Sequence, residues 1–148
     1  LELQIKGPSS ALMYWNNRAK TKHTFAGEWT RSGDKYSQDA DGFYAYGGRT
    51  DDMLKVSGIW VSPAEVEAAL VSHDAVLEAA VVGKDDEQKL VKPKAYVVLK
   101  PGKQATAEEL QDFVKSKLAP YKYPRWVEFT SELPKTATGK IQRFKLRG

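Results

Sequence analysis

Two helix-start signatures, each followed by apolar residues at helical spacing, constrain the fold of this sequence more than any other feature. In Ser62-Pro63-Ala64-Glu65 and again in Thr106-Ala107-Glu108-Glu109, a hydroxyl side chain precedes a glutamate by three residues, which is the pattern of a capping box. Apolar residues then recur every three or four positions, as on the buried face of an amphipathic helix. The signatures therefore predict two helices that pack on a shared core.

Short apolar segments alternate with the two predicted helices. They lie at residues 53–56 with 59–61, 77–82, 94–100 and 126–129. The run at 77–82 is almost continuously apolar, which is typical of a buried strand, and we expect Gly83 to end it. The order strand, helix, strand, strand, helix, strand predicts an α+β fold, a small carboxy-terminal domain with a short mixed sheet and packed helices.

Residues 1–50 follow a different pattern, with many aromatic residues and turn signals such as Gly7-Pro8 and Asp41-Gly42. This part is expected to be mostly β, with one short helix near residues 11–15. The alternating run at residues 1–6 resembles a strand whose apolar face lacks obvious partners. We interpret it as a piece of a longer protein.

The composition limits the possible classes of function but does not select one of them. A net charge of +4 and a pI near 9.2 suit a nucleic-acid-binding module or a protein that handles anionic small molecules. The absence of cysteine excludes a disulfide framework, a thiolate metal site and a cysteine nucleophile. No apolar run approaches membrane-spanning length and no signal-peptide pattern opens the sequence, so a cytoplasmic protein without membrane contact is expected.

The first of three polar segments that suit nucleotide chemistry is Ser32-Gly33-Asp34. A glycine beside a carboxylate on a turn lets Asp34 face a ligand closely. An ionised carboxylate is able to accept hydrogen bonds from both vicinal hydroxyls of a ribose. The alternative is an ordinary turn aspartate with no ligand.

The second segment is residues 48–58. Arg49 offers a fixed fork of donors for a ribose or phosphate oxygen, and Gly58 lets a ligand pass close to the backbone. The plain structural alternative is that Asp51-Asp52 is a solvated turn and Lys55 a surface charge.

The third segment, Thr136-Ala137-Thr138-Gly139-Lys140, is small, polar and flexible, as suits a loop that delivers one ammonium group into a site built elsewhere. It is not a phosphate-binding P-loop, because the first glycine of that motif is absent and Ile141 stands where a serine or threonine would coordinate magnesium. The alternative is a basic surface turn.

Together and in this order, the three segments resemble the adenylate-forming family of acyl-CoA synthetases, luciferases and peptide-synthetase adenylation domains, over essentially the whole chain. Residues 52–58 are similar to the acyl-CoA synthetase branch, and residues 119–125 and 136–147 are most similar to aryl-CoA ligases, benzoate-CoA ligases among them. Two alternatives stay open: a luciferase-like or peptide-synthetase relative, and a non-catalytic basic binding module.

The resemblance implies the two half-reactions of an acid-thiol ligase. A carboxylate, here benzoate or a related aromatic acid, attacks the α-phosphate of Mg-ATP to give an acyl-adenylate and pyrophosphate, and coenzyme A then displaces AMP. Lys140 would bridge the carboxylate and the α-phosphate, with Asp34 on the ribose hydroxyls and Arg49 beside it. Asp51 would be the hinge that swings Lys140 away and brings an opposite face in.

On that second face, the resemblance places Lys55 near the adenylate and Gly58 beside the pantetheine tunnel. Tyr121, Lys122 and Arg125 would meet the nucleotide of coenzyme A. The implied cofactors are ATP, Mg²⁺ and coenzyme A, with no Mg²⁺ ligand in this chain. An acetyltransferase and a deacetylase acting on Lys140 are further implied partners, whereas nucleic acid and membranes are not expected.

The hinge also implies a domain map. Residues 1–50 would be the β-rich end of a large amino-terminal adenylation domain, and residues 51–148 a mobile carboxy-terminal domain. The Gly/Ser/Thr-rich phosphate loop and the acyl pocket, which the family carries upstream, are absent from this sequence. The missing amino-terminal domain is therefore the expected partner, and the chain by itself is expected to be inactive.

Overall fold

The structure is a computed structural model that describes residues 1–147. The chain divides into two compact units, Leu1–Asp51 and a second unit that begins at Asp52. No helix in the described part of the chain is long and apolar enough to cross a membrane.

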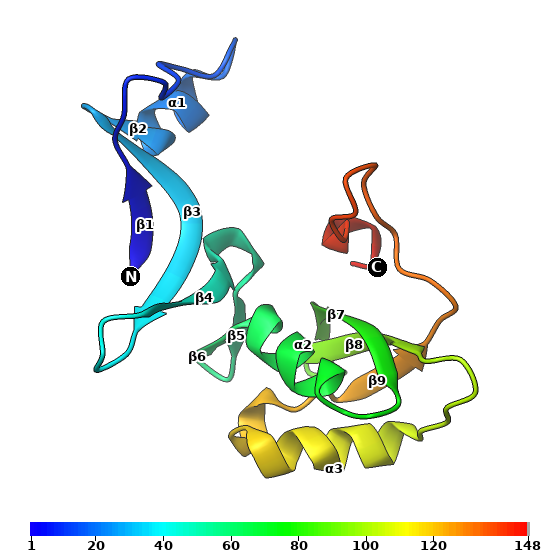
Figure 1. The fold of residues 1–148 in the computed structure, drawn as a ribbon. Helices are drawn as coiled ribbons and strands as arrows, with labels where there is room; N and C mark the ends of the chain where they lie inside the picture. Colours follow the sequence, from blue (N-terminus) through cyan, green and yellow to red (C-terminus); the bar gives the residue numbers. More distant parts are fainter. Residues whose placement is uncertain (148) are drawn as a thin grey trace. The chain divides into compact units, whose positions relative to one another are not determined.

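The first unit is built on an antiparallel sheet with one long strand that pairs with three others (Figure 1). Its elements are β1 (Glu2–Ile5), α1 (Arg18–Thr24), β2 (Phe25–Ala26), β3 (Trp29–Gln38) and β4 (Tyr44–Arg49). The long strand β3 pairs with β1, β2 and β4, so the opening run of the sequence has its backbone partner within this unit. The mostly β character expected for this part is confirmed.

The helix of the first unit lies further along the chain than predicted. Residues 11–15 are not helical, and α1 instead follows Asn17, whose side chain accepts a hydrogen bond from the backbone N–H of Lys20 at 3.0 Å. Asn16 has a positive φ of 50°, a turn conformation that an α-helix does not continue through. The asparagine cap therefore decides where the helix starts, and the apolar run before it does not.

The second unit is an α+β domain with a mixed three-stranded sheet, whose strands are coloured from green to orange in Figure 1. Its elements are β5 (Leu54–Val56), β6 (Ile59–Val61), α2 (Pro63–Val71), β7 (Val76–Asp85), β8 (Val91–Leu99), α3 (Ala107–Lys117) and β9 (Trp126–Phe129), with the 3-10 turns η1 (Thr50–Asp52), η2 (Pro120–Lys122) and η3 (Arg143–Lys145). Strands β7 and β8 are antiparallel, and β9 is parallel to β8 because α3 lies in the connection between them. The predicted order of elements, the mixed sheet and the packed helices are confirmed.

The apolar core lies in this second unit. Among residues 1–147, all buried apolar side chains belong to it. Those that are largest and fully buried on the helices and the sheet are Val66, Leu70, Val76, Val81, Val82, Val97, Leu110 and Val114. Burying a side chain of this size contributes roughly 1.5–3 kcal/mol, so the second unit has a much larger apolar driving force than the first.

The two predicted capping boxes have different outcomes. At α3 the box is complete, since Thr106 accepts from the backbone of Glu109 and the Glu109 carboxylate accepts from the backbone of Thr106. At α2 only the Ser62 cap forms. The Glu65 carboxylate binds the Lys122 ammonium at 2.6 Å instead, because a charged partner attracts it more strongly than a backbone N–H.

Strand β7 does not end at Gly83 but continues to Asp85. Gly83 pairs with Pro93 of β8, and a Cβ at this position would lie 3.0 Å from the side chains of Leu54 and Val91. The glycine therefore allows close packing in mid-strand and does not form a turn.

Candidate functional site

Asp34 and Arg49 are directly opposite each other on β3 and β4 of the first unit. The Arg49 guanidinium donates to the Asp34 carboxylate through Nη1 at 3.4 Å and to the Asp51 carboxylate through Nε at 3.1 Å. Burial lowers the pKa of Arg49, but the hydrogen bond to Asp51 and the charges of Asp51 and Asp34 outweigh that effect and raise it above its ordinary value. Arg49 is therefore a permanently charged link between two carboxylates.

Gly33 leaves the space that the Arg49 guanidinium occupies. Asp34 and Gly33 lie within β3, not on a turn as predicted, because β1 and β4 both pair with this strand. The pairing with β4 begins at Asp34, and the register with β1 shifts in the stretch that contains Gly33. Gly33 has a φ of +76°, and a Cβ there would come within 2.9 Å of Nη2 of Arg49. The Ser32 hydroxyl accepts a hydrogen bond from the backbone N–H of Asp34 at 3.1 Å, and this bond fixes the backbone of Gly33 between them. A cavity of about 270 Å³ adjoins Gly33 and Arg49 in this unit.

Lys55 and Gly58 lie on the β5–β6 hairpin of the second unit. Its turn residues Ser57 and Gly58 have φ values of +49° and +86°, as expected for a tight two-residue hairpin turn. A Cβ added to Gly58 would meet no atom within 4 Å, so the backbone here faces open space. Lys55 is exposed and pairs across the hairpin with Trp60, its ammonium 6.0 Å from the centre of an indole ring. The hairpin thus presents a cation, an aromatic ring and an open glycine.

The Lys140 loop is a closed turn. The Gly139 N–H donates to the carbonyl of Thr136 at 2.9 Å, and the Thr136 N–H donates to the carbonyl of Lys140 at 2.8 Å. The Thr136 hydroxyl also accepts from the Lys140 N–H at 3.1 Å. Gly139 has a φ of +82°, which favours glycine. The backbone of Lys140 is therefore fixed, while its exposed ammonium has no hydrogen bond or ion pair within the described chain.

The remaining predicted residues are used within the fold. Lys122 is bound to Glu65, and only 19% of its side chain is exposed. Arg125 stacks its guanidinium on the Tyr123 ring at 3.8 Å. Tyr121 packs partly buried against the main core. Of this group, the Lys122 ammonium would have to leave Glu65 before binding an anion.

A group of four charged residues that the sequence did not single out holds the chain after Lys140. Arg143 binds Glu67 through two parallel hydrogen bonds, of 3.0 and 2.6 Å, and its Nη1 lies 3.6 Å from Asp52. Arg147 binds the same aspartate at 2.6 Å. We call Asp52, Glu67, Arg143 and Arg147 the tail clamp. The arginines and the acids are far apart in the sequence, so no local motif could have revealed it.

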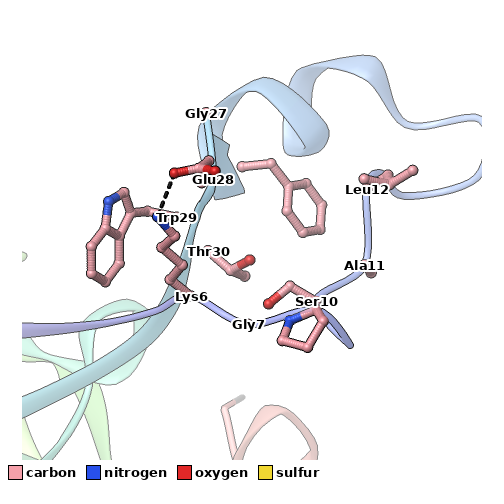
Figure 2. Close-up of a pocket in the computed structure, with 11 residues that line it drawn as sticks. Lys6, Gly7, Ser10, Ala11, Leu12, Gly27, Glu28, Trp29 and Thr30 are labelled. Atoms are coloured by element: carbon pink, nitrogen blue, oxygen red, sulfur yellow. Dashed lines mark hydrogen bonds and ion pairs between the residues drawn. The ribbon is translucent and has the colours of Figure 1, made fainter.

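A further cavity, of about 710 Å³, lies in the first unit (Figure 2). Trp29 and Leu12 line it, and Lys6 forms an ion pair with Glu28 at its edge. None of the predicted site residues lines this cavity. Within residues 1–147 there is also no group of three or more His, Asp or Glu side chains placed to hold a metal ion.

Comparison with known proteins identifies relatives of this chain in sequence and in structure. Over 99% of its length, the chain is 68% identical to a benzoate–CoA ligase of Thauera aromatica and 57% identical to a 4-hydroxybenzoate–CoA/benzoate–CoA ligase of Rhodopseudomonas palustris. The chain spans 28% of the length of each relative. The crystal structure of the anthranilate CoA ligase AuaEII in complex with anthranoyl-AMP matches 98% of this chain with a TM-score of 0.90 and 53% identity, over 29% of that protein.

A family model described as the AMP-binding enzyme C-terminal domain matches residues 65–140, just over half of the chain. This range contains β7, β8, α3 and β9 and ends at Lys140, the residue with the free ammonium. The chain therefore belongs to the AMP-binding enzyme family, and its residues 65–140 match the C-terminal domain of that family.

Proposed function

We propose that this chain is the carboxy-terminal part of an ATP-dependent carboxylate–CoA ligase, which forms an acyl-adenylate and then an acyl-CoA thioester with release of pyrophosphate and AMP. The observation that carries the proposal is the Lys140 ammonium, which is exposed and unpaired on a turn of fixed backbone within a matched AMP-binding C-terminal domain. Such a cation is suited to an anionic transition state that another part of the protein assembles.

In the first half-reaction, Lys140 is proposed to bridge the acid carboxylate and the α-phosphate of Mg-ATP. Charge accumulates there as the carboxylate attacks, and a positioned cation stabilises it. Asp34 is proposed to accept hydrogen bonds from the ribose hydroxyls, with Arg49 holding it in place from the opposite strand. Mg²⁺ is assigned to ATP and to residues outside this chain.

In the second half-reaction, the β5–β6 hairpin is proposed to face the adenylate. The open backbone at Gly58 suits passage of the pantetheine arm of coenzyme A, and Lys55 would approach the AMP. Tyr121, Lys122 and Arg125 are proposed for the coenzyme nucleotide. Lys122 is the weakest of the three, since its charge is already matched by Glu65.

The domain map is proposed as residues 1–50 from the end of the large adenylation domain and residues 51–148 as the mobile carboxy-terminal domain, with Asp51 as the hinge. In support, the division of the chain into two compact units falls between Asp51 and Asp52. The Asp51 carboxylate is largely exposed apart from its bond to Arg49, so a few backbone rotations here would disturb little packing.

Benzoate or a related aromatic acid is the proposed substrate. The supporting observation is that relatives sharing 68% and 57% of this chain's residues are ligases of benzoate and 4-hydroxybenzoate. The acid pocket itself would lie outside this chain, in the amino-terminal domain.

The test uses the longer protein that contains this chain and a panel of aromatic and aliphatic acids. We expect acid-dependent ATP–pyrophosphate exchange, and AMP release with thioester formation that requires coenzyme A. The 148-residue chain alone should show no exchange. Adenylation without any use of coenzyme A would point to a luciferase-like or peptide-synthetase relative, and the absence of adenylation with every acid would reject the proposal.

The hinge has its own test in the same protein. Asp51→Pro fixes φ at the proposed pivot and should slow one half-reaction far more than the other. Ala40→Pro serves as the control for inserting a proline, because Ala40 is the second residue of a turn closed by the hydrogen bond from the Gly42 N–H to the carbonyl of Asp39, a position that suits proline. Equal slowing of both half-reactions by Asp51→Pro would argue against a hinge.

A further inference from the structure

We propose that the tail clamp positions Lys140 for adenylate formation, with Glu67 as its central positioning residue. The inference rests on the proposed function and goes beyond it, because it assigns a task to four residues that the proposed function does not use and whose hydrogen bonds described above do not involve Lys140.

The turn that carries Lys140 is narrow and has few supports of its own. Its two ends are joined by a bridge between Lys135 and Ile141 and by a hydrogen bond from the Gln142 N–H to the carbonyl of Pro134, 2.8 Å long. Ile141 also packs, partly buried, against a small apolar cluster around Leu133. These contacts close the turn. Beyond Gln142, Leu146 packs against the same cluster and its carbonyl accepts a hydrogen bond from the Tyr96 hydroxyl at 3.3 Å, so the charged anchor described next acts together with an apolar one.

Arg143 supplies that anchor three residues after Lys140. Its guanidinium binds both oxygens of Glu67, and one of these oxygens also accepts from the backbone N–H of Val81 at 2.8 Å. Glu67 stands on α2 and Val81 on β7, so the arginine is tied to a helix and a strand of the core at one point. A bidentate contact of this kind fixes direction as well as distance.

The charges in the clamp balance. Two arginines face two carboxylates, and the Glu67 side chain is only 12% exposed. Removal of the Glu67 charge takes away the largely buried carboxylate that binds Arg143 at two points, which is a larger perturbation than the loss of an exposed pair. Arg147 adds a second bond, to Asp52, and so holds the tail on both sides of η3.

The consequence for catalysis is geometric. A displacement of about 1 Å in a catalytic group is able to lower a rate by about 10²-fold. Loss of the clamp should therefore slow adenylate formation, which needs Lys140, and spare thioester formation, which does not.

Glu67→Gln is the sharpest variant, because glutamine still accepts from the Val81 N–H but no longer carries the charge that holds Arg143. Arg147→Gln is a milder second variant, since the Arg147 side chain is 45% exposed. The matched control is Lys103→Gln, which breaks an exposed ion pair with Asp74, 2.7 Å long, elsewhere in the same unit.

The first readout does not depend on activity. In the 148-residue chain, trypsin should cleave after Arg143 and Lys145 at least about tenfold faster in Glu67→Gln than in wild type, with Arg147→Gln in between and Lys103→Gln unchanged. Mass spectrometry of the released peptides gives these rates. Equal rates in all four proteins would show that the clamp does not hold the tail and would overturn the inference.

The second readout separates positioning from general stability in the longer protein. Glu67→Gln should slow adenylation by about 10- to 100-fold and change thioester formation from a supplied acyl-adenylate by no more than about threefold. Adding Arg143→Gln to Glu67→Gln should lower the rate little further, because the two residues act as one unit. Equal losses in both half-reactions, or none, would overturn the positioning role while wild-type activity still supports the proposed function. Inactive wild type would reject the function alone, and the trypsin rates would still decide the clamp.

Discussion

The charged groups of the two units differ in what they are bound to. In the first unit Arg49 lies between Asp34 and Asp51, so its positive charge has carboxylate partners beside it. We call Asp34 and Arg49 the matched pair. In the second unit the Lys140 ammonium has no partner in the described chain, although three hydrogen bonds close the backbone turn that carries it. A matched pair is suited to hold an uncharged ribose in a fixed orientation, whereas an unmatched cation on a fixed turn is suited to meet an anion that arrives from elsewhere.

The supports of the two groups differ as well. Asp34 and Arg49 are held by the pairing of β3 with β4, so the backbone itself sets their separation. The turn of Lys140 is also closed by backbone hydrogen bonds, but its location on the domain is proposed to depend on side chains of the tail clamp. We therefore expect the first pair to be sensitive to backbone changes next to it, and Lys140 to be sensitive to its own charge above all.

The largest effect is expected from Lys140 itself. Lys140→Ala in the longer protein should slow adenylate formation by at least about 10²–10³-fold, the loss that follows removal of one preorganised donor to a developing negative charge. Conversion of a supplied acyl-adenylate and coenzyme A should continue. Lys140→Arg, which keeps the charge, is the control and should lose less. If the rates of both half-reactions fall by a similar factor, Lys140 supports binding in general. The proposed difference between an unpaired catalytic cation and the paired charges of Asp34 and Arg49 would then be wrong.

The next effect concerns the hairpin of the second unit. Gly58→Leu should raise the KM for coenzyme A by roughly tenfold and leave adenylation unchanged, because the side chain would fill the open space over the turn. Gly58→Ala introduces the same strain at a φ of +86° with little bulk, so it separates obstruction from strain. Similar kinetics for the leucine and alanine variants would remove Gly58 from the coenzyme path.

A smaller effect should follow from Gly33→Ala, which tests the backbone support of the matched pair. The new Cβ would push on Nη2 of Arg49 from 2.9 Å in addition to the strain at positive φ. Gly27→Ala in the same unit has a φ of +64° and no atom within 4 Å, so it introduces the strain alone, on the order of 1–3 kcal/mol. We expect Gly33→Ala to raise the KM for ATP and Gly27→Ala to leave it unchanged. Equal values would mean that the position of Arg49 does not matter for ATP.

The smallest effect is expected from Asp74, which forms a matched pair with Lys103 that serves no proposed site. The hydrogen bond from Lys103 and its charge lower the pKa of Asp74 from the ordinary value of 3.8. The contribution of the pair to stability is therefore present above pH 3.8 and lost as the pH falls through the lowered pKa. Urea unfolding of wild type and Asp74→Asn should differ slightly at neutral pH and converge in acid. A difference that stays constant with pH would contradict the charge pairing.

The elements of the second unit could be predicted because their causes are local. The capping hydroxyls of Ser62 and Thr106 sit beside the helices they start, and the apolar runs coincide with the strands of the sheet. Gly83 misled the prediction because its reason is a close approach by Leu54, which only the folded chain brings near. The helix of the first unit was misplaced because a polar cap at Asn17 outweighed the apolar residues before it.

In the candidate site, too, the features with local causes could be predicted from the sequence and the long-range contacts could not. The exposure of Lys140 follows from a loop of small polar residues, and the glycine at position 33 announced a special backbone conformation. The bonds of Glu65 to Lys122 and of Glu67 to Arg143 were not predictable, since each joins charges on different elements and a solvated charge has the same sequence pattern as a paired one.

The clamp also fixes an order of assembly. Arg143 binds Glu67 across 76 positions of the chain, and Arg147 binds Asp52 across 95. During synthesis the two acids are therefore made well before their arginine partners. The main core draws on residues from Leu54 to Val127, so it is able to form while the tail is still missing. Lys140 would then reach its place last, and a nascent chain that stops before Arg143 would have the family's fold without a positioned lysine.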